Sequence, residues 1–171
     1  RQRQMCIRDR GNVSPMILER LSREPYRLTM RRGSARIGTV PDAVQVGPKV
    51  CLINKYSASD GDLFPWGFRA LGLGKLIGTR TWGGIVGISG SLPYMDGTDI
   101  RVPFFTSFDP KTGSWIIENH GVDPDILIDN DPVKEWNGED QQLDRAIQEV
   151  MKELQNRKPL PGVPTPRDFS K

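Results

Sequence analysis

The chain has 171 residues, of which 36% are hydrophobic and 26% charged, and its formal net charge is +3. This length and composition suit one globular domain with an apolar core. No run approaches the roughly 20 apolar residues of a membrane span, and the mixed signs of charge along the middle of the chain argue against a nucleic-acid-binding face. Two cysteines, Cys6 and Cys51, and one histidine, His120, are too few and too scattered to predict a disulfide scaffold or a zinc site.

The N-terminal part of the chain predicts one helix and one strand. Residues 1–10 (RQRQMCIRDR) are polar and aperiodic, and we expect a non-native or disordered segment there. Ser14 and Pro15 are typical of a helix N-cap and first helical position, and the helix should end before Pro25. A short strand over 26–30 and a long loop over 31–48, which is rich in Gly and Pro, should follow. With no secretory leader pattern in this region, we expect a cytoplasmic protein.

The middle and end of the chain alternate between strands and helices. An apolar run at 49–54 predicts a buried strand, and S-A-S-D-G-D at 57–62 is a helix start signal. That helix should stop near Gly72 or Gly74. Strands are expected over 76–78, 85–86, 100–108, 115–118 and 126–128, then an amphipathic helix over 141–154. The proline-rich tail from residue 158 should be extended. The alternation predicts an α/β layered fold.

The junction between the strand at 49–54 and the following helix is the first candidate for chemistry. A hydroxyl at a helix N-terminus lies beside unpaired backbone N–H groups and the positive end of the helix dipole. An oxyanion formed there would be stabilised by those donors. More commonly, a serine at this position only caps its helix. The pattern alone therefore favours a capping role for Ser57 or Ser59 and leaves the catalytic interpretation open.

Three motifs change this balance. They are K-Y-S-A-S-D-G-D-L-F (55–64), L-G-L-G-K-L-I-G-T-R-T-W-G-G-I-V-G-I (71–88) and I-E-N-H-G-V-D-P-D (117–125). In this order they resemble the catalytic domain of tricorn-type serine proteases, which belong to the tail-specific, carboxyl-terminal-processing peptidases. The resemblance runs from about Gly11 to the C-terminus. It implies a crotonase-like (Clp-protease-like) α/β core over 11–157 with a C-terminal amphipathic helix, followed by a tail over 158–171.

The resemblance also implies roles for particular residues. Ser59 matches the nucleophile of a serine endopeptidase that hydrolyses oligopeptides through an acyl-enzyme. Glu118 matches the carboxylate that orients the catalytic histidine. The backbone N–H groups of Asp60 and Gly11 match the two arms of the oxyanion hole. No metal or cofactor is implied, and no substrate-binding residue is assigned.

The general base is the missing part of this constellation. Some members of the family use a Ser–Lys dyad, but Gly84 stands where their lysine would be, and glycine cannot act as a base. The remaining mechanism needs a histidine. His120 lies in a motif not known to supply the base, and a satisfied or solvent-facing histidine is the more common case. We therefore expect the base to lie upstream, and this chain alone to be inactive.

The resemblance further implies partners. They are a peptide substrate, an upstream region of the same protein (a histidine-bearing subdomain, a PDZ-like module and β-propellers) and further copies in a homo-oligomer. Nucleic acid and membrane are not expected. Two alternatives stay open: a noncatalytic crotonase-like scaffold, in which Ser59 would be dispensable, and an exported tail-specific protease, against which Gly84 argues.

Overall fold

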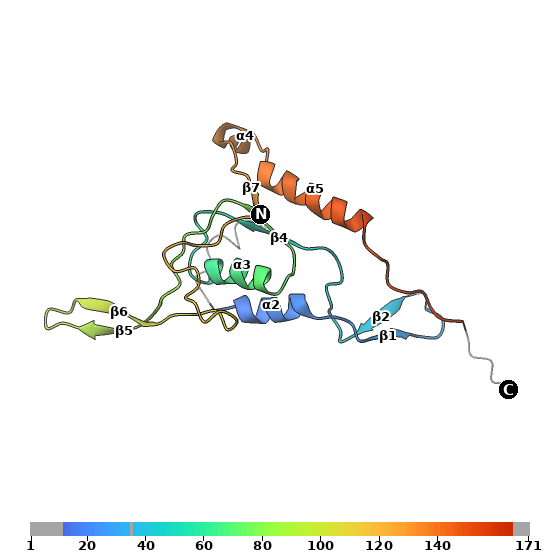
Figure 1. Cartoon of the computed structure of the whole chain (residues 1–171), viewed down its shortest axis with the longest axis horizontal. Coiled ribbons are helices and arrows are strands. Elements are labelled where there is room, and N and C mark those ends of the chain that lie inside the picture. The colour runs from blue at the N-terminus through green and yellow to red at the C-terminus, as the bar shows by residue number, and fades with distance from the viewer. Residues whose placement is uncertain (1–11, 35, 166–171) are drawn as a thin grey trace.

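The computed structural model describes residues 12–34 and 36–165, so the expectations for residues 1–10 and for Gly11 lie outside the described residues. Helices and runs of consecutive strands follow one another along the chain and stack in layers (Figure 1). In chain order the elements are α2 (Ser14–Ser22), β1 (Arg27–Met30), β2 (Ile37–Val40), β3 (Val50–Ile53), α3 (Asp60–Ala70), β4 (Lys75–Gly78), β5 (Gly87–Pro93), β6 (Asp99–Phe105), β7 (Ile126–Leu127), α4 (Pro132–Trp136) and α5 (Gln141–Gln155).

A three-stranded parallel sheet forms the centre of the molecule. β4 lies between β3 and β7, with Cys51 opposite Leu76 and Ile77 opposite Ile126. α3 connects β3 to β4 and packs on one face with α2 beneath it, whereas α5 packs on the other face (Figure 1). The predicted mixed α/β fold is confirmed. Parallel strands place their carboxyl ends at one edge of the sheet, and that edge is where open α/β sheets bind ligands.

The core lies between the sheet and the two helices α2 and α3. Phe68 of α3 and Leu76 of β4 are buried in it, as is Cys51. Gly67 lets α2 approach closely, because a Cβ at that position would lie 2.4 Å from a methyl group of Leu18. The starts of the two helices are also joined, because Ser14 forms hydrogen bonds with both the carboxylate and the carbonyl of Asp60.

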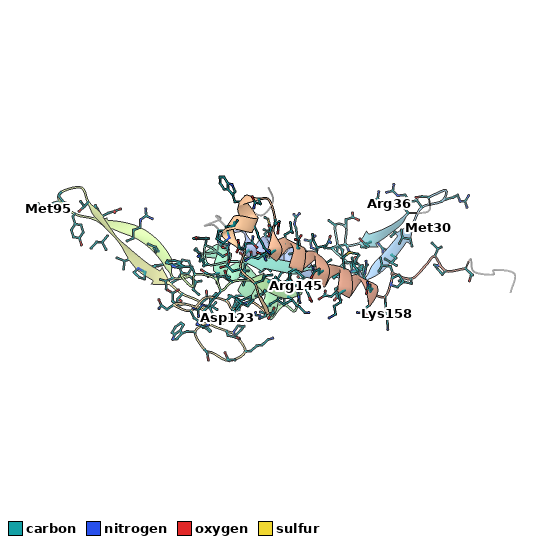
Figure 2. All side chains as sticks on the ribbon, turned by 90° about the horizontal axis from the view of Figure 1, so that it is seen from above. Met30, Arg36, Met95, Asp123, Arg145 and Lys158 are labelled. Carbon is teal, nitrogen blue, oxygen red and sulfur yellow. The ribbon has the colours of Figure 1, made fainter. Side chains whose placement is uncertain are left out.

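Two antiparallel hairpins extend from opposite ends of these layers. β1 pairs with β2 and β5 with β6, and Figure 2 shows Met95 at the tip of one hairpin, far from Met30 and Arg36 on the other. The long loop predicted over 31–48 was therefore wrong in part, since β2 lies inside it. An isolated four-residue strand among Gly and Pro residues is recognisable only through its partner β1.

Two predicted strands are absent from the described part of the chain. Ile85 and Val86 pair with no neighbouring strand, because both of their N–H groups donate to the Glu118 carboxylate. The segment 115–118 makes only one isolated bridge, Phe108 to Trp115, and then turns. Both short apolar runs were read as strands, whereas their backbone groups are used to build a loop.

The α2 helix begins differently from the prediction. Its N-cap is Val13, and Ser14 is already helical. The Ser14 hydroxyl does not cap its own helix, since it donates to the Asp60 carbonyl at 3.1 Å. A tertiary hydrogen bond has replaced the local one that the Ser-Pro pattern favours.

The apolar stripe of α5 points away from the sheet. Ile147 is 52% exposed, and its neighbour Ala146 is 4% exposed. Leu143, Met151 and Leu154 are also exposed, whereas the buried face carries polar side chains such as Glu149, which pairs with Lys75 of β4. The helix is amphipathic as predicted, and its polar side faces the domain.

None of the helices within residues 12–34 and 36–165 has the length and apolar character needed to cross a lipid bilayer.

Candidate active site

Ser59 occupies the turn between β3 and α3, at the N-cap position of the helix. Its backbone has φ 58° and ψ −116°, a conformation that L-residues rarely adopt and that costs on the order of 1–3 kcal/mol. Its hydroxyl makes no capping hydrogen bond to the helix. Serine therefore sits here in a strained conformation, and the usual stabilising role of an N-cap serine does not explain its presence.

Hydrogen bonds on both sides of the residue hold Ser59 in this conformation. Its N–H donates to the Gly84 carbonyl at 3.1 Å, and its carbonyl accepts from the N–H groups of Asp62 at 2.9 Å and Leu63 at 3.0 Å. Ser57 has a different position: it is buried, and its hydroxyl accepts from the Asn54 N–H at 3.4 Å. Of the two candidate serines, Ser57 closes the turn, and only Ser59 is half-buried rather than enclosed.

Asp60 is the first residue of α3. Within the described residues its backbone N–H donates no hydrogen bond, as expected for the first turn of a helix. Its carboxylate is buried, and Oδ2 accepts from the N–H groups of Val13 at 3.0 Å and Ser14 at 3.1 Å. The side chain thus fixes the segment that follows Gly11 beside the N-terminus of α3.

Asp62 is the third residue of α3 and is fully buried. It was not among the residues predicted from the sequence. Its carboxylate accepts from two successive backbone N–H groups, Gly83 at 2.8 Å and Gly84 at 3.2 Å. The sequence feature that could have indicated Asp62 is the pair Asp60 and Asp62 in the first turn of a helix that follows a strand. Carboxylates are favoured there by the helix dipole.

Glu118 binds the next two amides of the same loop. Its Oε2 accepts from the N–H groups of Ile85 at 2.7 Å and Val86 at 2.9 Å. The Ile85 N–H belongs to the same peptide group as the Gly84 carbonyl that binds Ser59. Standard peptide dimensions then place Oε2 within about 8 Å of the Ser59 backbone nitrogen. Among the described residues, Oε1 accepts no hydrogen bond. The structure therefore brings Ser59, Asp60 and Glu118 together around one loop.

The sequence pattern of Peptidase family S41 matches residues 10–128, which is more than half of the chain and includes every residue of the site described above. The chain belongs to peptidase family S41.

Relatives of this S41 chain share its sequence over most of its length. It is 42% identical over 151 residues to the tricorn protease of Thermoplasma volcanium, which covers 86% of this chain and 14% of that protein. It is 39% identical over 137 residues to tricorn protease homolog 1 of Streptomyces coelicolor, covering 80% of this chain and 13% of that one. A crystal structure of the tricorn protease superposes with a TM-score of 0.77 at 40% identity, over 85% of this chain and 14% of the other. The chain thus spans about one seventh of the length of these relatives.

Both backbone polar groups of Gly84 form hydrogen bonds. The Gly84 N–H binds Asp62 and its carbonyl binds Ser59. A Cβ at position 84 would meet ring atoms of Trp82 at 2.0 Å. A longer side chain there would have to displace that ring.

The backbone of His120 lies beside Gly83, but its side chain pairs with a different carboxylate. Its Nε2 lies 2.8 Å from Oδ2 of Asp123, and both side chains are exposed. In the part of the chain that the structure describes, it makes no hydrogen bond to Ser59 or to Glu118. The S41 chain therefore brings three of the four predicted site residues, Ser59, Asp60 and Glu118, around one loop, and the His120 side chain forms no hydrogen bond with Ser59 or Glu118 in the described structure.

A shallow pocket of about 440 Å³ lies next to the Ser59 turn. It opens at the carboxyl ends of the parallel strands, and Ser59 does not line it. Its rim includes Trp82, whose N–H donates to the Ser57 carbonyl at 2.9 Å. Its lining residues are Lys55, Thr79, Arg80, Thr81, Trp82, Asn119, His120 and Asp129.

Proposed function

We propose that this chain is the nucleophile-bearing part of a tricorn-like serine endopeptidase that hydrolyses oligopeptides. The observation that carries the proposal is Ser59 itself. It is a strained serine with positive φ at a strand–helix turn, held at both backbone groups, with a hydroxyl that its own helix does not use. Backbone strain that the surroundings hold in place is typical of functional positions, and a nucleophile on a sharp turn between strand and helix is a recurring arrangement.

The oxyanion hole in this proposal uses the backbone N–H groups of Asp60 and Gly11. Donors aimed at the developing negative charge are worth several kcal/mol, about 2.7–4 for a single donor. The Asp60 N–H lies beside Ser59 and donates no hydrogen bond to the described residues, which supports the first arm. For the second arm, the support is indirect: the Asp60 carboxylate binds the amides of Val13 and Ser14, just after Gly11.

The base is an imidazole contributed by a region outside this chain, and Glu118 orients it. The imidazole takes the Ser59 proton as Oγ attacks the peptide carbonyl, and returns it to the leaving amine when the C–N bond breaks. Water then hydrolyses the resulting ester by the same route. The oxygen Oε1 of Glu118, which accepts no hydrogen bond from the described residues, supports this role. We propose that the chain by itself turns over no peptide.

The finer assignments rest on the same family resemblance. We propose a crotonase-like core over 11–157, which the parallel sheet between α3 and α5 supports. The described part of the proline-rich tail, residues 158–165, contains no helix or strand, and the expectations for residues 1–10 and 166–171 lie outside the described residues. We also propose that the intact protein is cytoplasmic, is several times longer than this chain and forms a homo-oligomer. The small share of each relative that the chain spans supports the additional length.

The test joins this chain to its upstream coding region and measures cleavage of a fluorogenic peptide. We expect Ser59→Ala to abolish turnover, and Ser57→Ala, at the neighbouring buried serine, to retain it within a few-fold. The isolated chain should show no turnover, and adding the upstream region as a separate polypeptide should restore it. Full turnover by Ser59→Ala would refute the proposal and favour a noncatalytic scaffold. Turnover by the isolated chain that His120→Ala abolishes would show that the base lies within it.

A further inference from the structure

Three hydrogen bonds connect Ser59, Asp62 and Gly84 in a closed ring. The Ser59 N–H donates to the Gly84 carbonyl, the Gly84 N–H donates to the Asp62 carboxylate at 3.2 Å, and the Asp62 N–H donates to the Ser59 carbonyl. A second bond, from the Gly83 N–H to the same carboxylate at 2.8 Å, fixes the orientation of the loop. Movement of any one of the three residues therefore changes the position of the other two.

The charge of Asp62 has no other use in the described structure. The side chain is fully buried, and its two oxygens accept only the amides of Gly83 and Gly84. Burying a carboxylate is expensive unless hydrogen bonds compensate for the lost water. A neutral side chain would fill this space at a lower desolvation cost. The carboxylate is therefore explained by its two hydrogen bonds, because two successive amides need two acceptor oxygens in one plane.

The ring also explains how Ser59 stays in a conformation that is unfavourable in isolation. A strained residue persists only where its surroundings over-determine it. Here the Gly84 carbonyl holds the Ser59 N–H, and two N–H groups of the first turn of α3, one of them from Asp62, hold its carbonyl. Asp60 differs, because its carboxylate holds the start of α2 instead of the loop that contacts Ser59.

We propose that Asp62 is a positioning residue for the reaction: its carboxylate fixes the Gly83–Gly84 loop, and that loop fixes the backbone and therefore the hydroxyl of Ser59. Asp62 touches neither substrate nor the reacting atoms. This inference rests on the proposed function, because it assigns to Asp62 a role in aiming the nucleophile of that same site.

The first variant is Asp62→Asn in the protein that joins this chain to its upstream region. Asparagine keeps one acceptor and places an NH₂ donor against the second amide, so one hydrogen bond is lost and two donors face each other. A misplacement of about 1 Å at a reacting group can lower the rate about 100-fold. We expect kcat for a fluorogenic peptide to fall about 10- to 100-fold with KM within about twofold, because substrate binding does not depend on the aim of the hydroxyl.

The second variant is Asp62→Glu, which keeps the charge and both oxygens but moves them by about one C–C bond. It should also lower kcat at least tenfold, and it remains informative if Asp62→Asn does not fold. The matched control is Glu149→Gln, a buried carboxylate on α5 across the sheet, which should lower the midpoint of thermal unfolding and leave kcat unchanged at temperatures where the protein is folded.

The outcomes separate this inference from the proposed function. If Ser59→Ala abolishes turnover while a folded Asp62→Asn or Asp62→Glu protein keeps kcat within twofold of the original, the positioning role is wrong and the proposed function stands. The Asp62 variants could also lower kcat only in proportion to the fraction of protein that is unfolded, as Glu149→Gln would. In that case Asp62 contributes stability alone, and the inference is also overturned. If Ser59→Ala keeps full turnover, both fall together.

Discussion

The strain at Ser59 gives a prediction opposite in sign to the usual effect of glycine. Replacing a residue by glycine normally destabilises a protein by about 0.5–1 kcal/mol, because the unfolded chain gains freedom. At Ser59 the folded state gains about 1–3 kcal/mol when the Cβ that makes φ 58° unfavourable is removed. We therefore expect Ser59→Gly to stabilise the chain by about 1 kcal/mol and to abolish any peptidase activity. In a chain of 171 residues this corresponds to roughly 2–4 °C in Tm.

Equilibrium unfolding in urea, followed by tryptophan fluorescence, measures this difference. Two variants make the comparison specific. Ser59→Ala keeps the Cβ and loses only a hydroxyl that caps nothing, so its unfolding free energy should stay within about 0.5 kcal/mol of the original. Ala58→Gly changes the adjacent residue, which is not among the described residues with positive φ, and it should destabilise by about 0.5–1 kcal/mol. If Ser59→Gly loses as much stability as Ala58→Gly, the argument from strain is refuted.

Three further predictions concern the surrounding structure. Gly83→Ala should destabilise the chain by about 2–4 kcal/mol in urea unfolding, since φ is +88° and the new Cβ would lie 2.4 Å from the Gly121 nitrogen; a change below 0.5 kcal/mol would contradict the tight packing of these loops. Ile147→Glu should leave the unfolding free energy within about 0.5 kcal/mol, because the side chain is exposed although the sequence pattern is that of a core stripe. The hydrogen bond from Lys75 lowers the pKa of Glu149. Its folded-state pKa is therefore below the unfolded one, so the stability it contributes is present above the unfolded pKa and is lost as pH falls through the folded value. Glu149→Gln should flatten the acid limb of stability measured between pH 6 and 2, at about the unfolded glutamate pKa near 4.3 and below it; an unchanged acid limb would mean that this ion pair is not formed in solution.

Much of the fold was predictable because the signals are local. The apolar run before S-A-S-D-G-D predicted β3 and the start of α3, and Gly72 predicted its end. The errors came where backbone groups bind distant partners. Ile85 and Val86 have the residue types of a strand, yet their amides bind a carboxylate more than thirty residues away. Ser14 has the pattern of an N-cap, yet its hydroxyl binds Asp60.

For the candidate site, too, some residues were predictable from local motifs and one was not. Ser59, Asp60 and Glu118 were predicted as site residues because their motifs resemble those of a known family, and the structure brings them around one loop. Asp62 was missed because an acidic residue in the first turn of a helix is common, and only the tertiary contacts with Gly83 and Gly84 distinguish it from others.

By itself, the sequence of this protein determined the buried strand β3, the strand–serine–helix turn and the family, because each is encoded in short stretches of residues adjacent along the chain. The tertiary structure decided which serine is strained and which only closes a turn, which carboxylates are buried, and which face of α5 meets the sheet. These depend on amides and side chains that are far apart in sequence and meet only when the helices pack on the parallel sheet, so no local pattern specifies them.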